Sequence, residues 1–410
     1  MTLPNKWFNI SLMIIKPKIR GFICITAHPD GCEAHIQEQV NYVRTQKEFS
    51  NAPKRVLILG ASTGYGLASR IVAAVAGKAD TFGVFYERPG EDNKPASPGW
   101  YNSVAFEKAA KAEGVKAYAM NGDAFSADFK KQVVQALKAT LGQVDCVVYS
   151  LAAPRRTDSK TGEVYRSVLK PIGQSFSGKT VNTDKAEVSE VTLEPANDEE
   201  VRQTVKVMGG EDWEEWMHVL AEENLLAEGA TTIAYSYIGP KVTWPIYKDG
   251  TIGKAKEHLA KTAEVLNQFL KERCHGKALI SVNKAVVTQA SSAIPIVPLY
   301  TSVLFKVMKE KHLDEDCIQQ MYRLFAGLFD GQEIKRESET CVRLDDREFL
   351  PEVQAEVEAI WKEINTENLR QLSDFDGYQK KFLHLFGFDF DNVKYDAETQ
   401  EKRNFEHLIS

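Results

Sequence analysis

Short apolar runs alternate with amphipathic segments along most of this chain. RVLIL (residues 55–59) is a continuous apolar run, typical of a strand that is buried on both faces, and residues 63–77 after it suit a helix. In residues 126–141, Phe129, Val133, Leu137 and Leu141 recur every four positions. That spacing predicts an amphipathic helix that begins near Ser126.

The same alternation continues on both sides of these elements. Further strands are expected at 83–87, in the strand and loop 116–125, and at 145–154, 230–238 and 277–287, and further helices at 104–114 and from Thr251 onward. Repeated strand–helix units imply a parallel sheet with helices on both faces. We therefore predict an α/β fold with a Rossmann-type, doubly wound parallel sheet.

No repeat or low-complexity linker divides the chain. Residues 154–197 are polar, turn-rich and too long for a simple connection, which favours an insertion that forms part of a substrate site. The chain beyond about residue 300 is mainly helical by pattern. We expect a leader outside the core (1–12) and one enlarged domain (13–410), to which 154–230 and 300–410 contribute substrate-side and helical additions.

Composition narrows the class of protein. The 410 residues are 43% hydrophobic and 26% charged, and the net charge is −6, which argues against nucleic acid as a partner. The opening apolar run is too short to span a bilayer and lacks a cleavage site. The six dispersed cysteines are typical of reduced thiols. We expect a cytoplasmic monomer without membrane insertion.

The segment LGASTGYG closes the first predicted strand and opens the helix after it. Gly60, Gly64 and Gly66 permit a tight turn and close approach of a pyrophosphate to the helix N-terminus. Glu87, twenty-one residues after Gly66, is placed to accept hydrogen bonds from ribose hydroxyls. A glycine turn alone can also be a purely steric solution, but the strand, helix and acidic residue in register favour a dinucleotide site.

The segment YKDGTIGKAK holds a candidate catalytic pair, Tyr247 and Lys256. A continuous helix would place the two on opposite sides, because nine residues turn it by nine steps of about 100°. Asp249-Gly250 is a turn signal, however, and Thr251 is a candidate N-cap. Tyr247 would then lie in the preceding loop, where both side chains can reach one ribose. The alternative is an aromatic core residue and a solvated lysine.

A second tyrosine and lysine, Tyr237 and Lys241 in YIGPK, stand four residues apart. Gly239-Pro240 between them breaks a helix, so the two are not expected to share a helical face. Tyr237 instead ends a predicted strand, at the ligand edge of the sheet.

Four other segments have alternative interpretations. HPDGCEAH (residues 28–35) lacks a second pair of metal ligands, which favours a polar turn over a zinc site and leaves no metal expected. Trp213 and Trp216 favour a core stripe over an acyl-chain wall. Arg155 and Arg156 are suited equally to phosphate groups of a ligand and to solvent. VTQASSAIP alone is typical of a turn.

Ten segments occur in one order that resembles a known family. They are IKPKIRGFIC, GASTGYG, GWYN, NGDAF, YSLAAPRRTD, VNTDKAEV, VMGGEDWE, AYSYIGP, IYKDGTIGKAK and VTQASSAIP. Together they resemble the FabV-type enoyl-acyl-carrier-protein reductases and the related trans-2-enoyl-CoA reductases, from about Met13 nearly to the C-terminus.

This resemblance implies an enlarged short-chain-dehydrogenase fold with a Tyr-x8-Lys catalytic motif, here Tyr247 and Lys256, and a substrate-contacting Tyr237. It implies that NADH is bound by Gly60, Ala61, Ser62, Thr63, Gly64, Tyr65, Tyr86, Glu87, Asp123, Ala124, Leu151, Ala152, Lys256, Val286, Val287 and Thr288. The implied activity is NADH-dependent reduction of enoyl-CoA or enoyl-acyl-carrier-protein to the saturated thioester.

Two features depart from the family pattern. Residues 1–12 precede the usual family start, and Glu257 follows Lys256 where some members have a second lysine. The second departure favours CoA as the carrier. The alternative functions are a 3-oxoacyl (carbonyl) reductase and a dinucleotide-sensing protein without catalysis.

Overall fold

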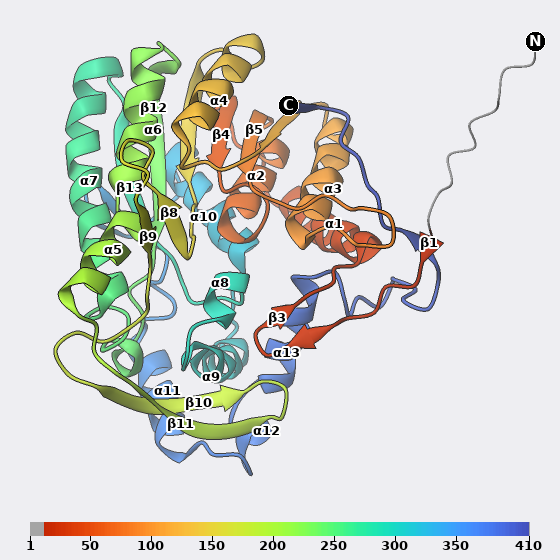
Figure 1. Cartoon of the computed structure of the whole chain (residues 1–410), viewed down its shortest axis with the longest axis vertical. Coiled ribbons are helices and arrows are strands. Elements are labelled where there is room, and N and C mark those ends of the chain that lie inside the picture. The colour runs from red at the N-terminus through yellow and green to blue at the C-terminus, as the bar shows by residue number, and fades with distance from the viewer. Residues whose placement is uncertain (1–11, 410) are drawn as a thin grey trace, which may run out of the picture.

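The computed structural model describes residues 12–409, and a nine-stranded sheet forms its centre (Figure 1). Six parallel strands run in the order β6-β5-β4-β7-β12-β13. They are β4 (Arg55–Leu59), β5 (Asp80–Phe85), β6 (Ala117–Asn121), β7 (Val144–Tyr149), β12 (Leu226–Ser236) and β13 (Lys277–Val282). The chain order reverses between β4 and β7, which confirms the predicted doubly wound sheet.

Short strands from the C-terminal part extend both edges of this sheet. β17 (Leu408–Ile409) pairs in parallel with β6. At the other edge, β15 (Cys341–Arg343) pairs in parallel with β13, and β14 (Arg336–Ser338) pairs antiparallel with β15. The final third of the chain is therefore built into the same sheet as the first strands.

The alternation of side chains along β4 explains its continuous apolar sequence. Val56 and Ile58 belong to one buried cluster, and Leu57 and Leu59 belong to a second cluster on the opposite face. The first cluster includes α1 (Pro29–Arg44), α2 (Gly64–Val75), α3 (Pro98–Ala112) and α10 (Cys317–Phe329). The second includes α4 (Ala127–Ala139), α6 (Glu211–Glu222) and α7 (Thr251–Cys274).

Trp213 and Trp216 of α6 lie in the second cluster and are fully buried, which confirms the core interpretation. α5 (Asp198–Met208) packs on the outer side against α7.

Several predicted strands extend too far toward their carboxyl ends. The strand expected at 83–87 ends at Phe85, the one at 145–154 ends at Tyr149, and the one at 277–287 ends at Val282. Further apolar residues lie beyond each end, after Ser150 in the second segment and after Asn283 and Lys284 in the third, but their backbones leave the ladder to form loops at the sheet edge. The apolar pattern therefore located these strands but did not indicate the residue at which backbone pairing ends.

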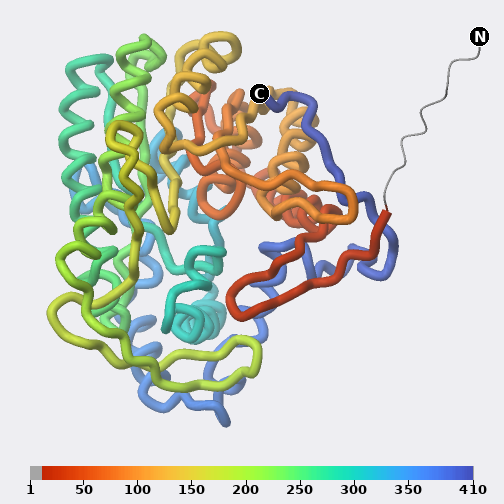
Figure 2. Tube along the Cα trace, viewed as in Figure 1, coloured from red at the N-terminus to blue at the C-terminus, as the bar shows by residue number. Residues whose placement is uncertain are grey.

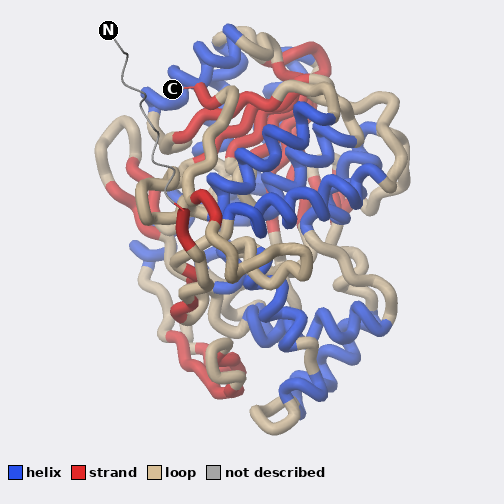
Figure 3. Tube along the Cα trace, turned by 90° about the vertical axis from the view of Figure 1, so that its right-hand side faces the viewer, coloured by secondary structure: helices blue, strands red, loops and turns tan. Residues whose placement is uncertain are grey.

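Residues 154–197 form two hairpins. β8 (Arg155–Thr157) pairs with β9 (Val164–Arg166), and β10 (Phe176–Asn182) pairs with β11 (Glu187–Leu193). β10 packs on α9 (Val297–Glu310), which also contacts α11 (Pro351–Glu363) and α13 (Phe375–His384). The β10–β11 hairpin, α9 and α11 lie below the main sheet in Figure 1, and Figure 3 shows the same lower layer from the side. α8 (Gln289–Ser292) and α12 (Leu369–Leu372) are single turns.

The first described residues lie against the last ones (Figure 2). β1 (Leu12–Met13) pairs with β16 (Thr399–Gln400), and the hairpin of β2 (Ile19–Arg20) and β3 (Ile23–Cys24) follows. The predicted leader, 1–12, lies outside the described residues except for Leu12. Among residues 12–409 no helix is both long and apolar enough to cross a bilayer.

The polar turn predicted at HPDGCEAH is wrong, because this segment begins helix α1. His28 is the N-cap and its Nδ1 accepts a hydrogen bond from the amide of Gly31 at 3.3 Å. Ile36, Val40 and Val43 are buried at helical spacing on the same helix. No group of three potential metal-ligating His, Cys, Asp or Glu side chains converges within residues 12–409.

Candidate active site

The glycine turn between β4 and α2 packs directly on the end of β7. Gly60 has φ of +89°, and a Cβ there would lie 2.2 Å from the carbonyl oxygen of Ser150. A Cβ on Gly66 would lie 2.0 Å from the carbonyl oxygen of Gly60. Both positions therefore exclude any side chain.

The N-terminus of α2 is open for an anion. Thr63 is its N-cap but its side chain makes no capping hydrogen bond. The first amides of a helix have no intrahelical acceptor and carry partial positive charge. The amides of Gly64 and Tyr65 can thus hold a pyrophosphate at the point where the strand order reverses.

Glu87 is tied to this turn by a contact that sequence reasoning missed. It lies two residues past the end of β5, and its Oε1 accepts a hydrogen bond from Ser62 Oγ at 2.7 Å. The Asn121 side chain accepts from the amide of Glu87 and donates to its carbonyl oxygen, at 2.7 and 2.8 Å. Burial raises the pKa of the Glu87 carboxyl above its ordinary value.

The other predicted cofactor residues follow strand ends as expected. Tyr86 is 80% exposed beside Glu87. Asp123 accepts a hydrogen bond from the amide of Phe125 at 3.0 Å, just after β6. Leu151 and Ala152 lie in the loop after β7, and the carbonyl oxygen of Ala124 accepts from Trp216 Nε1 at 3.2 Å.

Val286, Val287 and Thr288 lie in the connection between β13 and α8. Thr288 is the N-cap of α8, and its Oγ1 accepts from the amide of Ser291 at 3.1 Å. The methyl group of Thr288 lies 3.6 Å from where a Cβ of Gly64 would stand. A cavity of about 200 Å³ borders this junction, lined by Thr63, Gly64, Val287 and Thr288 together with residues of α1, α10 and α13.

Tyr247 and Lys256 are separated by a turn, as predicted. η1 (Lys241–Thr243) and the following turns carry Tyr247, and Lys256 lies in the second turn of α7. The helix begins one residue earlier than the N-cap prediction required, because Gly250 is the N-cap and Thr251 is already the first helical residue. Thr251 Oγ1 instead donates to the carbonyl oxygen of Val168 at 2.6 Å, which ties α7 to the insertion.

Both side chains meet the carboxyl end of β12. The Tyr247 ring packs edge-on against the ring of Tyr237, with centroids 4.9 Å apart and an interplanar angle of 78°. Lys256 Nζ donates to the carbonyl oxygen of Tyr235 at 3.1 Å. Burial raises the pKa of Tyr247 to about 12 and lowers that of Lys256 to about 8, because each charged form loses hydration.

The short-spaced pair does not form a helical face. Gly239 has φ of +78°, Pro240 is extended, and Lys241 is exposed at the start of η1. Tyr237 follows the last residue of β12, as expected, and its hydroxyl lies 3.4 Å from Glu348 Oε1.

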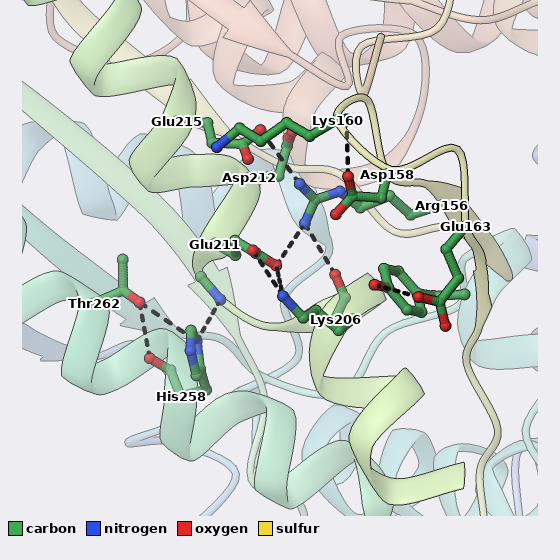
Figure 4. A network of polar contacts seen from close by, with 12 residues as sticks. Arg156, Asp158, Lys160, Glu163, Lys206, Glu211, Asp212, Glu215, His258 and Thr262 are labelled. Carbon is green, nitrogen blue, oxygen red and sulfur yellow. Dashed lines mark hydrogen bonds and ion pairs between the residues drawn. The ribbon is translucent and has the colours of Figure 1, made fainter. Parts of the chain in front are cut away.

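Figure 4 shows that Arg156 belongs to a buried ion network. Its guanidinium pairs with Glu211 and Glu215, each at 3.2 Å, and it is 2% exposed. Asp212 next to them pairs with Lys130 at 2.5 Å and accepts from Tyr149 at 3.1 Å. Neither interpretation of Arg156, as a phosphate ligand or a solvated side chain, is therefore right, whereas Arg155 is exposed.

Comparison with protein families identifies three consecutive regions. A family model for the trans-2-enoyl-CoA reductase catalytic region matches residues 94–329, and one for the NAD(P)H binding domain of trans-2-enoyl-CoA reductase matches residues 14–92. A model described as the enoyl reductase FAD binding domain matches residues 337–399.

Relatives match nearly the whole chain. The enoyl-[acyl-carrier-protein] reductase [NADH] of Opitutus terrae is 56% identical over 388 residues, which cover 94% of this chain and 98% of that protein. The trans-2-enoyl-CoA reductase [NADH] of Ruminiclostridium cellulolyticum is 52% identical, with 97% and 100% covered.

Solved structures agree. The Clostridium acetobutulicum trans-2-enoyl-CoA reductase in complex with NADH superposes with a TM-score of 0.92 at 43% identity, covering 95% of this chain and 98% of that one. The Treponema denticola trans-2-enoyl-CoA reductase in complex with NAD superposes at 0.90 and 48% identity, covering 97% and 100%.

The region matched by the FAD model does not fit a flavin dinucleotide. Free amides at a helix N-terminus are the usual site for the pyrophosphate of a dinucleotide. In residues 337–399, α11 begins with Pro351, which has no amide hydrogen, and Glu352. The N-cap of α13 is Asp374, whose carboxylate accepts from the amide of Gly377 at 3.1 Å, and Asp376 lies in the first turn. Carboxylates at these N-termini would repel a phosphate, so no flavin step is assigned to this chain.

Gly253 lets the Tyr247 loop rest on helix α7, and this contact is testable. A Cβ at Gly253 would lie 1.7 Å from the carbonyl oxygen of Lys248 and 2.7 Å from that of Tyr247. We expect Gly253→Ala to lower the free energy of unfolding by about 1–3 kcal/mol, because backbone must move to admit the methyl group. Urea denaturation measures this.

Lys254→Ala is the matched control on the same helix turn. Lys254 is exposed and forms an ion pair with Glu257 at 3.0 Å on the surface, so its loss should change stability by less than about 0.5 kcal/mol. Equal stability of Gly253→Ala and the unmodified protein would refute the close packing of loop on helix.

Proposed function

Because this chain belongs to the trans-2-enoyl-CoA reductase family, we propose that it reduces the trans-2 double bond of enoyl thioesters with NADH, using Tyr247 and Lys256. The observation that carries this assignment is the meeting of Tyr247, Tyr237 and Lys256 at the end of β12. The glycine turn lies at the same sheet edge, after β4, with one strand, β7, between β4 and β12.

The side chains fit the chemistry of such a reduction. NADH supplies a hydride for the β-carbon, and negative charge then develops on the thioester oxygen of the substrate. A tyrosine whose pKa is near 12 keeps its proton at neutral pH, so Tyr247 can donate a hydrogen bond to that oxygen. Lys256 as a cation holds ribose hydroxyls and favours the developing charge. A proton at the α-carbon completes the saturated thioester.

The remaining predicted residues have distinct tasks in cofactor binding. Gly60 to Tyr65 would hold the pyrophosphate, and Glu87 the adenosine ribose. The loops at Asp123–Ala124 and Leu151–Ala152 would flank the adenosine, and Val286 to Thr288 would cover the pyrophosphate from the other side. The hydrogen bond from Ser62 to Glu87 supports this division, since it joins the pyrophosphate and ribose positions.

The substrate carrier, oligomeric state and compartment complete the proposal. The substrate is an enoyl-CoA or an enoyl-acyl-carrier-protein, and Tyr237 contacts it. Glu257, whose presence favours CoA, is exposed and pairs with Lys254. We propose a monomer in the cytoplasm, and the dispersed free cysteines suit that reducing compartment.

NADH oxidation with two substrates tests the assignment directly. Crotonyl-CoA, which has the enoyl double bond, should be reduced, and acetoacetyl-CoA, which has only a ketone to reduce, should not. Reduction of acetoacetyl-CoA alone would indicate a carbonyl reductase. Binding of NADH without turnover of either would indicate a dinucleotide sensor. The same assay with crotonyl-acyl-carrier-protein compares the two carriers.

The role of Glu87 predicts cofactor preference. Its carboxylate should repel the additional phosphate of NADPH, so NADH should have the higher kcat/KM. Glu87→Ala should narrow the ratio of the two kcat/KM values. Ser62→Ala, which removes only the hydrogen bond to Glu87, should narrow it less. Equal kcat/KM for both cofactors in the unmodified protein would contradict this role.

The catalytic pair predicts different losses for two tyrosines. Tyr247→Phe removes one hydroxyl and should lower kcat by about 10²- to 10⁴-fold while NADH still binds. Tyr237→Phe should cost less, partly in KM. Lys256→Met should weaken NADH binding as well as turnover. Near-normal kcat in Tyr247→Phe, together with loss of activity in Lys241→Met, would instead make YIGPK the catalytic pair.

The lowered pKa of Lys256 predicts a pH dependence in NADH use. The amine is a cation below about pH 8 and neutral above it. Because the proposed contact with ribose needs the cation, kcat/KM for NADH should fall as pH rises through about 8. If kcat/KM for NADH stayed constant up to the pH at which an ordinary lysine loses its proton, the Lys256 amine would not be desolvated in the free protein.

A further inference from the structure

A fully buried carboxyl group, Glu348, joins three elements behind Tyr237. It lies in the loop between β15 and α11 and has no exposed surface. Its Oε2 accepts from the amide of Ala285 at 2.8 Å, just after β13. Its Oε1 accepts from the Tyr300 hydroxyl of α9 at 2.6 Å and lies 3.4 Å from that of Tyr237.

The charges around Glu348 do not neutralise it by direct contact. Lys284 is buried nearby, but its Nζ is used by the carbonyl oxygens of Ala285 and Glu315 and by Asp314, at 3.0 to 3.3 Å. Asp345 pairs with Arg343 at 2.7 Å.

Burial and the nearby Asp345 raise the pKa of Glu348, while Tyr300, Ala285 and Lys284 oppose the rise, and the result is about 7. Tyr237 and Tyr300 themselves stay protonated, because burial and this carboxylate raise both of their pKa values. Among these groups, Glu348 is therefore the one that changes charge near neutral pH.

The position of the proton on neutral Glu348 follows from its contacts. The amide of Ala285 is a fixed donor to Oε2, and the carbonyl oxygen of a neutral acid accepts better than its hydroxyl oxygen does. This contact therefore favours Oε2 as the carbonyl oxygen and Oε1 as the protonated one, within reach of Tyr300 and Tyr237. The Tyr300 hydroxyl can still donate to Oε1, and the carboxyl proton can then be donated to the oxygen of Tyr237.

A change in the protonation of Glu348 reverses the direction of its hydrogen bond with Tyr237. When Glu348 is ionised, the Tyr237 hydroxyl donates to it and offers only lone pairs elsewhere. When Glu348 is neutral, Tyr237 accepts from it and its own hydrogen is free for another acceptor. The ring of Tyr237 packs on the ring of Tyr247, so that hydrogen becomes available beside the proposed catalytic hydroxyl.

We propose that Glu348 is a positioning residue that decides, by its own protonation, whether Tyr237 donates a hydrogen bond to the enoyl thioester. The inference rests on the proposed function, because a thioester carbonyl oxygen is an acceptor and needs a donor. No covalent step is assigned to Glu348. Its proton stays within the hydrogen bond to Tyr237.

The test is the pH profile of kcat/KM for crotonyl-CoA at saturating NADH, which keeps Lys256 in contact with the cofactor. In the unmodified protein this value should fall about 3- to 10-fold as pH rises through about 7, the loss expected for one neutral hydrogen bond. In Glu348→Gln the amide oxygen can accept from Ala285 while the NH₂ group donates to Tyr237 at every pH. The fall near 7 should therefore disappear.

Two further variants separate this role from a structural one. Tyr300→Phe removes a hydrogen bond that stabilises the carboxylate, so the fall should move to higher pH. In a Tyr237→Phe background, Glu348→Gln should leave the profile unchanged, because the responding hydroxyl is absent. Glu352→Gln, an exposed carboxyl four residues along, is the matched control and should keep the profile of the unmodified protein.

Thermal unfolding follows the same titration without activity. A protein with a carboxyl group whose pKa is raised on folding becomes less stable as pH rises between the unfolded and folded pKa values of that group. For Glu348 this range is from about 4.5 to about 7. The Tm of Glu348→Gln relative to the unmodified protein should rise over that range and stay level above it. Tyr300→Phe, if Glu348→Gln does not fold, should extend the range upward.

The outcomes distinguish the two proposals. No reduction of crotonyl-CoA at any pH would overturn the proposed function. Reduction with the same fall near pH 7 in the unmodified protein and in Glu348→Gln would overturn the role of Glu348 alone. A rise in Tm without a change in the activity profile would show that Glu348 titrates but does not act through Tyr237.

Discussion

The register of the parallel strands at the point where their order reverses is the constraint on which the site depends. Leu59 of β4 pairs with Tyr149 of β7, and Tyr149 pairs with Ala234 of β12, so β4 and β7 end at one level and β12 continues for two more residues. Gly60, Ser150 and Tyr235 come next at this level, with Tyr235 still in β12. Parallel pairing fixes this alignment through every residue of the ladder, and it brings the open N-terminus of α2 beside the carbonyl group that Lys256 contacts.

Residues of the C-terminal part also reach this edge of the sheet. β15 extends the sheet next to β13, and the loop after β15 returns Glu348 to the amide of Ala285. Tyr300 of α9 meets the same carboxyl, and the β10 hairpin packs on α9. The insertion and the final third of the chain thus converge behind Tyr237. Glu348, which is not proposed to contact substrate, can therefore determine the hydrogen bonding of Tyr237, which is.

Much of the fold and part of the candidate site could be predicted from short stretches of sequence. The apolar run at 55–59, the glycine turn and Asp249-Gly250 each state a backbone requirement in neighbouring residues, so the strand, the anion site and the break before α7 were predictable. The carboxyl ends of the strands were not predictable, because further apolar residues lie beyond the last paired residue of each strand. Glu348 gave no signal, since its three partners come from distant parts of the chain. Arg156 likewise became a core residue only through Glu211 and Glu215 of α6.

The most direct test of the central claim is the fate of the hydride. Crotonyl-CoA would be incubated with NADH that carries deuterium at the transferred position, and the product examined by mass spectrometry and NMR. The account predicts butyryl-CoA with one deuterium on the β-carbon and a proton from water on the α-carbon. Recovery of unchanged crotonyl-CoA, or butyryl-CoA with the deuterium on the α-carbon, would contradict it.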